Sequence, residues 1–151
     1  MKPDPASPQV HWQRELRCPA QLGQLPALHD LVRAACRQAR ASGEAAHDLL
    51  LMAEEACVNV MHHAYPDRDD GMLLLRVRVT PRGIELVLQD QGVAFDPLAQ
   101  PAAAVTADVE HRAIGGLGVH LIRQMADRLD YRRDPQLGNV LVIEKHLPQA
   151  G

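Results

Sequence analysis

Aromatic residues are scarce in this sequence: Phe, Trp and Tyr together make up 3% of its 151 residues. The core must therefore be built from Leu, Val, Ile, Ala and Met, and a hydrophobic fraction of 46% is enough for one globular domain. An excess of basic residues is also missing, because the formal net charge is -3. This charge argues against direct nucleic-acid binding, which needs a basic surface.

Cysteines and long apolar runs are few as well. Cys18, Cys36 and Cys57 lie far apart and form no CxxC pair, which predicts a reducing compartment and no structural zinc site. The chain has no run of about 18 uncharged apolar residues that could span a membrane, and its start, MKPDPASPQ, lacks the apolar region of a signal peptide. We therefore expect a soluble cytoplasmic protein that does not associate with a membrane.

Hydrophobic periodicity predicts how the chain is organised. Residues 1–8 are Pro-rich and are expected to form a flexible lead, followed by a single domain over 9–148. The domain pattern gives the order strand, helix, helix, strand, strand, long loop, helix, strand, strand. The predicted strands cover 10–19, 72–80, 84–90, 130–134 and 139–147, and the predicted helices cover 21–41, 44–64 and 118–129.

This order of elements predicts the fold class. We expect an α+β fold, a two-layer sandwich in which the helices cover one face of a mostly antiparallel, mixed sheet. The strand at 10–19 alternates weakly and is expected at a sheet edge. In the first helix, Leu22, Leu25 and Leu28 are expected to pack on the sheet.

The second predicted helix carries polar residues along one face. Glu55, Asn59 and His63 follow one another at intervals of four residues, which places them on the same side of a helix. A carboxylate and a carboxamide one turn apart can present oxygens to Mg²⁺ or to a water beside a phosphate. The alternative is a surface helix whose polar residues only face water, as expected for Glu54. Metal binding by His62 and His63 is disfavoured, because neighbouring residues on a helix diverge.

Asp90 follows an apolar strand and continues its buried face. Strand alternation points Ile84, Leu86 and Leu88 inward, and the same period points Asp90 inward. An unpaired buried carboxylate is costly, so a protein group or a ligand must satisfy it. The alternative is that Asp90 caps its own turn.

The long segment 97–114 and the glycines after it form another candidate feature. The segment is Ala-rich, and a loop of this length inside a compact domain is usually functional or mobile. Gly115, Gly116 and Gly118 come just before a predicted helix, where free backbone N–H groups can bind an anion. Glycines also serve ordinary turns, and neither a P-loop nor a dinucleotide fingerprint is present.

Three motifs occur together in one order: EEACVNVMHHAY, DQGVAFDP and GGLGVHLIRQMAD. In this combination the chain resembles the GHKL ATPase and kinase superfamily, whose ATP-binding (Bergerat) fold is shared by gyrase B, histidine kinases and the MutL repair protein. Within it, the chain resembles the small bacterial anti-sigma-factor serine kinases over about residues 10–147. The spelling HAY, the FDP after the Asp-Gly pair and GGLG-x-x-LI are specific to that branch.

The resemblance implies a role for each motif residue. Glu55 matches the general base that takes a proton from a substrate serine, and Asn59 matches the residue that holds Mg²⁺ against the phosphates of ATP. Asp90 matches the carboxylate that accepts a hydrogen bond from the adenine amino group, and Gly92 lets the base approach. These roles agree with the needs of phosphoryl transfer, which are positioned donors, a metal and a base.

The resemblance also implies further nucleotide-binding residues. They are His63, Phe95, Gly115, Gly116, Leu117 and Gly118. Segment 97–114 corresponds to a lid that closes over ATP. The first glycine box reads DQGVAF and departs from the DxGxG of the wider superfamily, which weakens the analogy to gyrase-type ATPases. The chain also lacks the phospho-accepting helix pair of a complete histidine kinase.

The implied function is an ATP- and Mg²⁺-dependent serine kinase in a partner-switching module. Its expected partners are a sigma factor that it sequesters, a small STAS-type anti-sigma-factor antagonist that it phosphorylates, and a second copy of itself. The homodimer would form through the first strand and first helix, with Val10 and a partly exposed Trp12 as candidates. Two alternatives remain: a nucleotide-binding switch that transfers no phosphate, which Glu55 disfavours, and a kinase with a target other than sigma.

Overall fold

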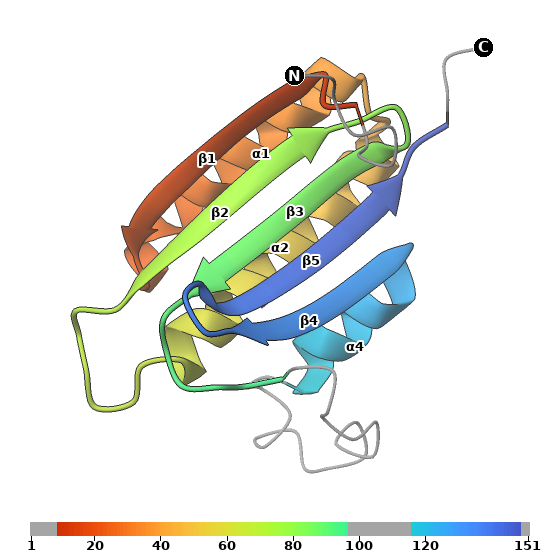
Figure 1. Ribbon diagram of the computed structural model, residues 1–151. Helices are drawn as coiled ribbons and strands as arrows, with labels where there is room; N and C mark the ends of the chain where they lie inside the picture. The colour runs from red at the N-terminus through yellow and green to blue at the C-terminus, as the bar shows by residue number, and fades with distance from the viewer. Residues whose placement is uncertain (1–8, 97–115, 149–151) are drawn as a thin grey trace, which may run out of the picture.

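The computed structural model describes residues 9–96 and 116–148 (Figure 1). The elements follow the predicted order. They are β1 (Trp12–Pro19), the short 3₁₀ helix η1 (Leu22–Gln24), α1 (Leu25–Ala39), α2 (Gly43–His63), β2 (Met72–Val79), β3 (Gly83–Asp90), α4 (Gly116–Met125), β4 (Arg128–Asp134) and β5 (Gly138–His146).

The five described strands form one sheet in the order β1-β2-β3-β5-β4. All four pairings between them are antiparallel, so the described sheet is simpler than the mixed one expected. The prediction that the first strand lies at an edge is confirmed. β3 and β5 are neighbours although α4 and β4 separate them in the chain, and this pairing sets Asp90 opposite Asn139.

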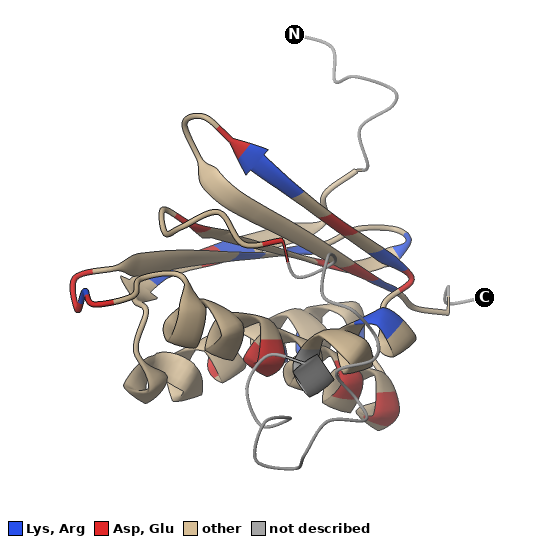
Figure 2. Ribbon diagram, turned by 90° about the horizontal axis from the view of Figure 1, so that it is seen from below, with Lys and Arg blue, Asp and Glu red and all other residues tan. Residues whose placement is uncertain are grey.

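The three α-helices of the described ranges lie against one face of the sheet, which confirms the two-layer α+β prediction (Figure 2). Alternation explains the core, since β2 buries every second side chain. Large side chains from the sheet and the helices are fully buried between the layers, among them Leu28, Leu49, Met52, Leu75, Leu86 and Ile122. None of the helices in the described ranges is long and apolar enough to cross a membrane.

The first helical segment differs from the prediction at its start. Residues 22–24 form a 3₁₀ turn and α1 begins at Leu25. Leu28 is buried and Leu25 packs against the core, as expected, but Leu22 is 52% exposed because it precedes the amphipathic helix. The turn into α2 is well defined: Arg40 adopts a left-handed conformation with φ of 53°, and the Ser42 hydroxyl accepts a hydrogen bond from Ala45 N at 3.1 Å.

The last helix is displaced from its predicted bounds. α4 covers Gly116–Met125 where 118–129 was expected, so the helix already begins at Gly116, and Gly118 lies in its first turn. The helix ends because Asp127 N donates to Glu144 O at 2.8 Å and carries the chain into the sheet. Arg128 and Leu129 then pair with β5. Strand pairing therefore overrides the helical pattern of these residues.

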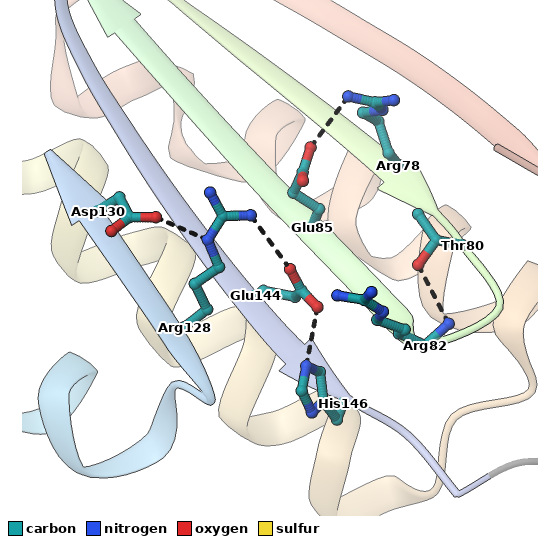
Figure 3. Close-up of polar contacts among 8 residues, drawn as sticks. All are labelled: Arg78, Thr80, Arg82, Glu85, Arg128, Asp130, Glu144 and His146. Atoms are coloured by element: carbon teal, nitrogen blue, oxygen red, sulfur yellow. Dashed lines mark hydrogen bonds and ion pairs between the residues drawn. The ribbon is translucent and has the colours of Figure 1, made fainter. Parts of the chain in front are cut away.

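The open face of the sheet holds two buried carboxylates in facing positions. Glu85 of β3 and Glu144 of β5 are direct partners in the register, and they are 7% and 6% exposed. Figure 3 shows a nitrogen-bearing side chain beside each: Arg78 Nη1 lies 3.2 Å from Glu85 Oε1, and His146 Nε2 lies 2.8 Å from Glu144 Oε1. Arg128 Nη1 is also 3.7 Å from Glu144. Facing like charges destabilise a sheet unless they are compensated, so the guanidinium groups of Arg78 and Arg128 offset the repulsion between the two carboxylates.

Removing the cation that compensates Glu85 should destabilise the protein. We expect Arg78→Met, which keeps much of the apolar stem, to lower the free energy of unfolding by about 1–3 kcal/mol, because it leaves a buried carboxylate without its partner. Arg33→Met, in the exposed pair with Asp30, should change it by less than about 0.5 kcal/mol. Urea denaturation measures the free energy of unfolding of both variants. Equal losses of stability would show that the Arg78–Glu85 pair contributes no more than an exposed ion pair does.

Candidate nucleotide site

A partly open pocket with about 400 Å³ of empty space, some of it continuous with the solvent, lies between the second half of α2 and the sheet. Three polar side chains reach it from different elements: Asn59 of α2, Asp90 of β3 and Asn139 of β5. Its remaining walls are apolar or aromatic and include Ala56, Val60, Leu88, Phe95, Tyr131 and Leu141. An apolar pocket with a few convergent polar groups is the usual form of a small-molecule site.

Asp90 points inward, as its place in the strand predicts, and is 6% exposed. Its Oδ1 accepts hydrogen bonds from Gly92 N and from Asn139 Nδ2, both at 2.9 Å. Asp90 therefore does cap its own turn, yet its Oδ2 accepts no hydrogen bond from any residue within 9–96 and 116–148. Burial raises the pKa of this carboxyl, while the donors from Asn139 and Gly92 and the charge of Arg133 oppose the rise.

Asn139 organises the floor of the pocket. Its Nδ2 donates to Asp90 Oδ1 and, at 2.8 Å, to Val93 O. Its Oδ1 accepts from the Tyr131 hydroxyl and, at 3.5 Å, from Phe95 N. The sequence interpretation missed this residue, because an Asn after the Gly138 turn looks like turn chemistry until β5 is known to pair with β3.

The three polar residues predicted on one face of α2 lie one turn apart on that helix. Asn59 lines the pocket, whereas Glu55 is half-buried one turn earlier, beyond the lining residues. Burial raises the pKa of Glu55, and the charge of Glu54 raises it further. Glu54 itself is only partly solvated, since its Oε1 lies 3.5 Å from His29 Nε2 on α1.

His63 joins the end of α2 to the segment that follows β3. Its ring stacks on Phe95 with centroids 5.6 Å apart and planes 20° from parallel. Burial lowers the pKa of His63, and the neighbouring His62 lowers it further. The neutral ring thus favoured suits a wall of an apolar pocket better than a metal ligand position. Among the described residues, no group of three or more His, Cys, Asp and Glu could hold a metal ion.

Comparison with known proteins agrees with this geometry. The family model described as "histidine kinase-like ATPase domain" matches residues 18–145. The chain belongs to the histidine kinase-like ATPase family.

Curated relatives of this ATPase-family chain narrow the assignment to an RsbW-like branch. The serine/threonine-protein kinase BtrW of Bordetella bronchiseptica is 27% identical over 68% of this chain and 72% of the relative. The serine-protein kinase RsbW of Bacillus velezensis is 30% identical over 66% of this chain and 64% of the relative. RsbW of Listeria monocytogenes serotype 4a is 32% identical over 70% of this chain and 69% of the relative. The alignments thus span about two thirds of each protein.

In this ATPase fold a glycine is needed at position 92 for a structural reason, in addition to the predicted role of leaving room for the nucleotide base. A Cβ atom here would lie 2.2 Å from Ala64 O at the end of α2. Val93 N also donates to Ala64 O at 2.8 Å, and Arg133 Nη1 donates to Gly92 O at 2.7 Å. The turn after Asp90 is therefore pressed against the helix that carries Glu55 and Asn59.

A methyl group at position 92 should push the turn after Asp90 away from the end of α2. We expect Gly92→Ala to lower the free energy of unfolding by about 1–3 kcal/mol, because the backbone of Ala64 must move. Gly43→Ala is the matched control, since nothing lies within 4 Å of a Cβ atom there. Thermal unfolding of both variants is the measurement, and an unchanged midpoint for Gly92→Ala would contradict the tight contact.

Tyr65, the tyrosine of the HAY motif, fixes the other side of this turn. Its hydroxyl donates to Met72 O and accepts from Gln91 N at 2.8 Å. Gly71 lies flat against the ring, since a Cβ atom there would be 2.2 Å from it. Tyr65 thus ties the segment after α2 to β2 and to the residue that follows Asp90.

The glycine motif of this ATPase-family chain is described only in part. The backbone of Gly116, Leu117 and Gly118 forms the first turn of α4, which packs beside α2 (Figure 1). Glycines are tolerated in a first turn, where backbone N–H groups lack helical partners and can face an anion. Gly115 and the predicted lid 97–114 lie outside the described residues.

Proposed function

We propose that this chain is an ATP-dependent protein kinase that transfers the γ-phosphate of ATP to a serine of a partner protein. The observation that carries the proposal is the pocket that Asp90 of the sheet and Asn59 of α2 both line. The family assignment implies ATP binding, and the curated relatives are named serine- or serine/threonine-protein kinases.

The floor of the pocket is suited to adenine. The Oδ2 oxygen of Asp90, which no described residue bonds, accepts a hydrogen bond from the exocyclic amino group. Leu88, Leu141 and Val60 offer apolar contacts for the flat base. Phe95, held by its stack on His63, closes one side.

Asn59 is suited to hold Mg²⁺ beside the phosphates. Its side chain lines the pocket and makes no hydrogen bond to any residue in the described part of the chain, so its carboxamide oxygen is available. Hard oxygen ligands of this kind, together with phosphate oxygens, are what Mg²⁺ prefers. The ion, when bound, neutralises charge that develops on the transferred phosphoryl group.

Glu55 is suited to act as the base. It lies one turn from Asn59 on the same helix, and its raised pKa brings it closer to neutral pH, where a general base works best. The serine hydroxyl gives its proton to Glu55 while its oxygen forms a bond to the γ-phosphorus. The bond from that phosphorus to the bridging oxygen breaks, and ADP leaves.

We further propose that the kinase works in a partner switch. Its partners would be a small STAS-type antagonist that carries the serine, a sigma factor that it sequesters, and a second copy of the chain. β1 is an edge strand that pairs with β2 on one side only in the described sheet. It carries a partly exposed Trp12, and Arg14 lies 5.1 Å from the centroid of its ring. Val10, just before it, is 37% exposed. These features support a dimer contact along β1.

Incubation with γ-labelled ATP and Mg²⁺ beside candidate antagonists tests the kinase. We expect label on a serine of one antagonist and none when that serine is replaced by alanine. Tight ATP binding without transfer to any candidate would favour the alternative, a nucleotide-binding switch. Transfer to an antagonist whose dephosphorylated form releases no sigma factor would favour a kinase with another target.

A further inference from the structure

The acceptor capacity of Asp90 is limited by the protein itself. One carboxylate oxygen has about two lone-pair positions for hydrogen bonds. At Oδ1 these are filled by Gly92 N and Asn139 Nδ2, each at 2.9 Å. A ligand can therefore use only Oδ2.

The orientation of Asn139 is fixed by its four neighbours. Its Nδ2 faces two acceptors, Asp90 Oδ1 and Val93 O, and its Oδ1 faces two donors, the Tyr131 hydroxyl and Phe95 N. Rotating the amide by half a turn would set its oxygen against both acceptors. The donor toward Asp90 is thus a built feature of the floor.

This limit discriminates between purine bases. Adenine offers one amino group to an acceptor, which Oδ2 alone can satisfy. Guanine offers the adjacent donors N1–H and N2–H₂, which need both oxygens of a carboxylate, as an arginine does. With Oδ1 filled, one guanine donor stays buried and unpaired, which weakens binding by about tenfold or more.

We propose that Asn139 is a positioning residue that makes Asp90 a single acceptor and thereby selects adenine over guanine nucleotides. The proposal rests on the nucleotide site of the proposed function. It goes further by assigning base selectivity to a residue that need not touch the base.

Two variants isolate the donor. Asn139→Thr keeps a hydroxyl that can donate to Asp90, and Asn139→Val has nearly the same shape without it; both are well suited to a strand. Calorimetric titration of the full chain with ADP, GDP and IDP gives the selectivity. We expect Asn139→Val to reduce the ratio of the GDP to the ADP dissociation constant by about tenfold, and Asn139→Thr to keep it within about threefold of the wild type.

A pH profile distinguishes positioning from a merely structural role. The Asn139 donor lowers the pKa of Asp90, so its loss raises that pKa. Binding of ADP needs the carboxylate and is lost as pH falls through the pKa. The midpoint of ADP binding should therefore move to higher pH in Asn139→Val and not in Asn139→Thr.

Nucleotide binding by the wild-type protein tests the role of Asn139 even if the variants do not fold. IDP has N1–H but lacks the 2-amino group, so Oδ2 alone can satisfy it, and with Oδ1 filled GDP should bind about tenfold more weakly than IDP. GDP binding as tightly as IDP or more tightly, or equal selectivity in the Val and Thr variants, would overturn the role of Asn139 while leaving the ADP site intact. No ADP binding by the wild type would instead overturn the nucleotide site and this proposal with it.

Discussion

Replacing Glu55 with glutamine should lower phosphate transfer by about 10²–10⁴-fold, while ADP binding stays within about threefold of the wild type. Glutamine keeps the size of the side chain but cannot take the proton from serine. Glu55 lies one turn before Asn59 and outside the lining of the pocket, so the nucleotide should not sense the change. Transfer rates at saturating ATP and calorimetric binding of ADP separate the two effects.

Glu54→Gln is the matched control for Glu55→Gln. The charge of Glu54 raises the pKa of Glu55, so its removal should lower that pKa and move the acid limb of the transfer rate to lower pH. Transfer itself should persist. Equal losses of transfer in the two variants, or full transfer by Glu55→Gln, would contradict the assignment of Glu55 as the base.

Asp90→Asn should weaken ADP binding by about 10- to 100-fold and leave the protein at least as stable as the wild type at neutral pH. The amide oxygen can still accept from Gly92 N and Asn139 Nδ2, but the amide nitrogen would face the adenine amino group, and two donors cannot pair. The pKa of Asp90 is raised in the fold by burial. A raised carboxyl pKa contributes stability below the unfolded pKa, and this contribution is lost as pH rises through the folded pKa.

Thermal unfolding measured at several pH values checks this sign. The unfolding midpoint of the wild type should fall as Asp90 ionises with rising pH. The Asp90→Asn variant should not show this fall, because its amide does not titrate. Calorimetry with ADP provides the binding arm. An unstable variant, or one that binds ADP as tightly as the wild type does, would show that Asp90 serves the fold and not the ligand.

Local periodicity accounts for most of what could be predicted. The order of elements, the edge position of β1 and the inward direction of Asp90 all follow from alternation or helical spacing within one segment. The position of Asn139 opposite Asp90 could not be predicted in this way. It depends on the pairing of β3 with β5, which are separated by α4 and β4.

The differences from prediction have the same origin in contacts between distant segments. Arg128 and Leu129 continue a helical pattern, yet the register with β5 draws them into β4. Gly92 was predicted to make room for a base, and the structure adds a contact with Ala64 that no local signal contains. Leu22 has the spacing of a core residue but precedes α1 and is exposed.

The nucleotide site can be tested residue by residue with one titration. Resonances of the Gly92 amide and the Asn139 side-chain amide report on the floor of the pocket, and the indole of Trp12 reports on the opposite end of the sheet. On addition of ADP and Mg²⁺ we expect the Gly92 and Asn139 resonances to shift together and saturate while the Trp12 resonance stays in place. A shift of Trp12 with Gly92 and Asn139 unmoved would place the nucleotide elsewhere and contradict the site between α2 and the sheet.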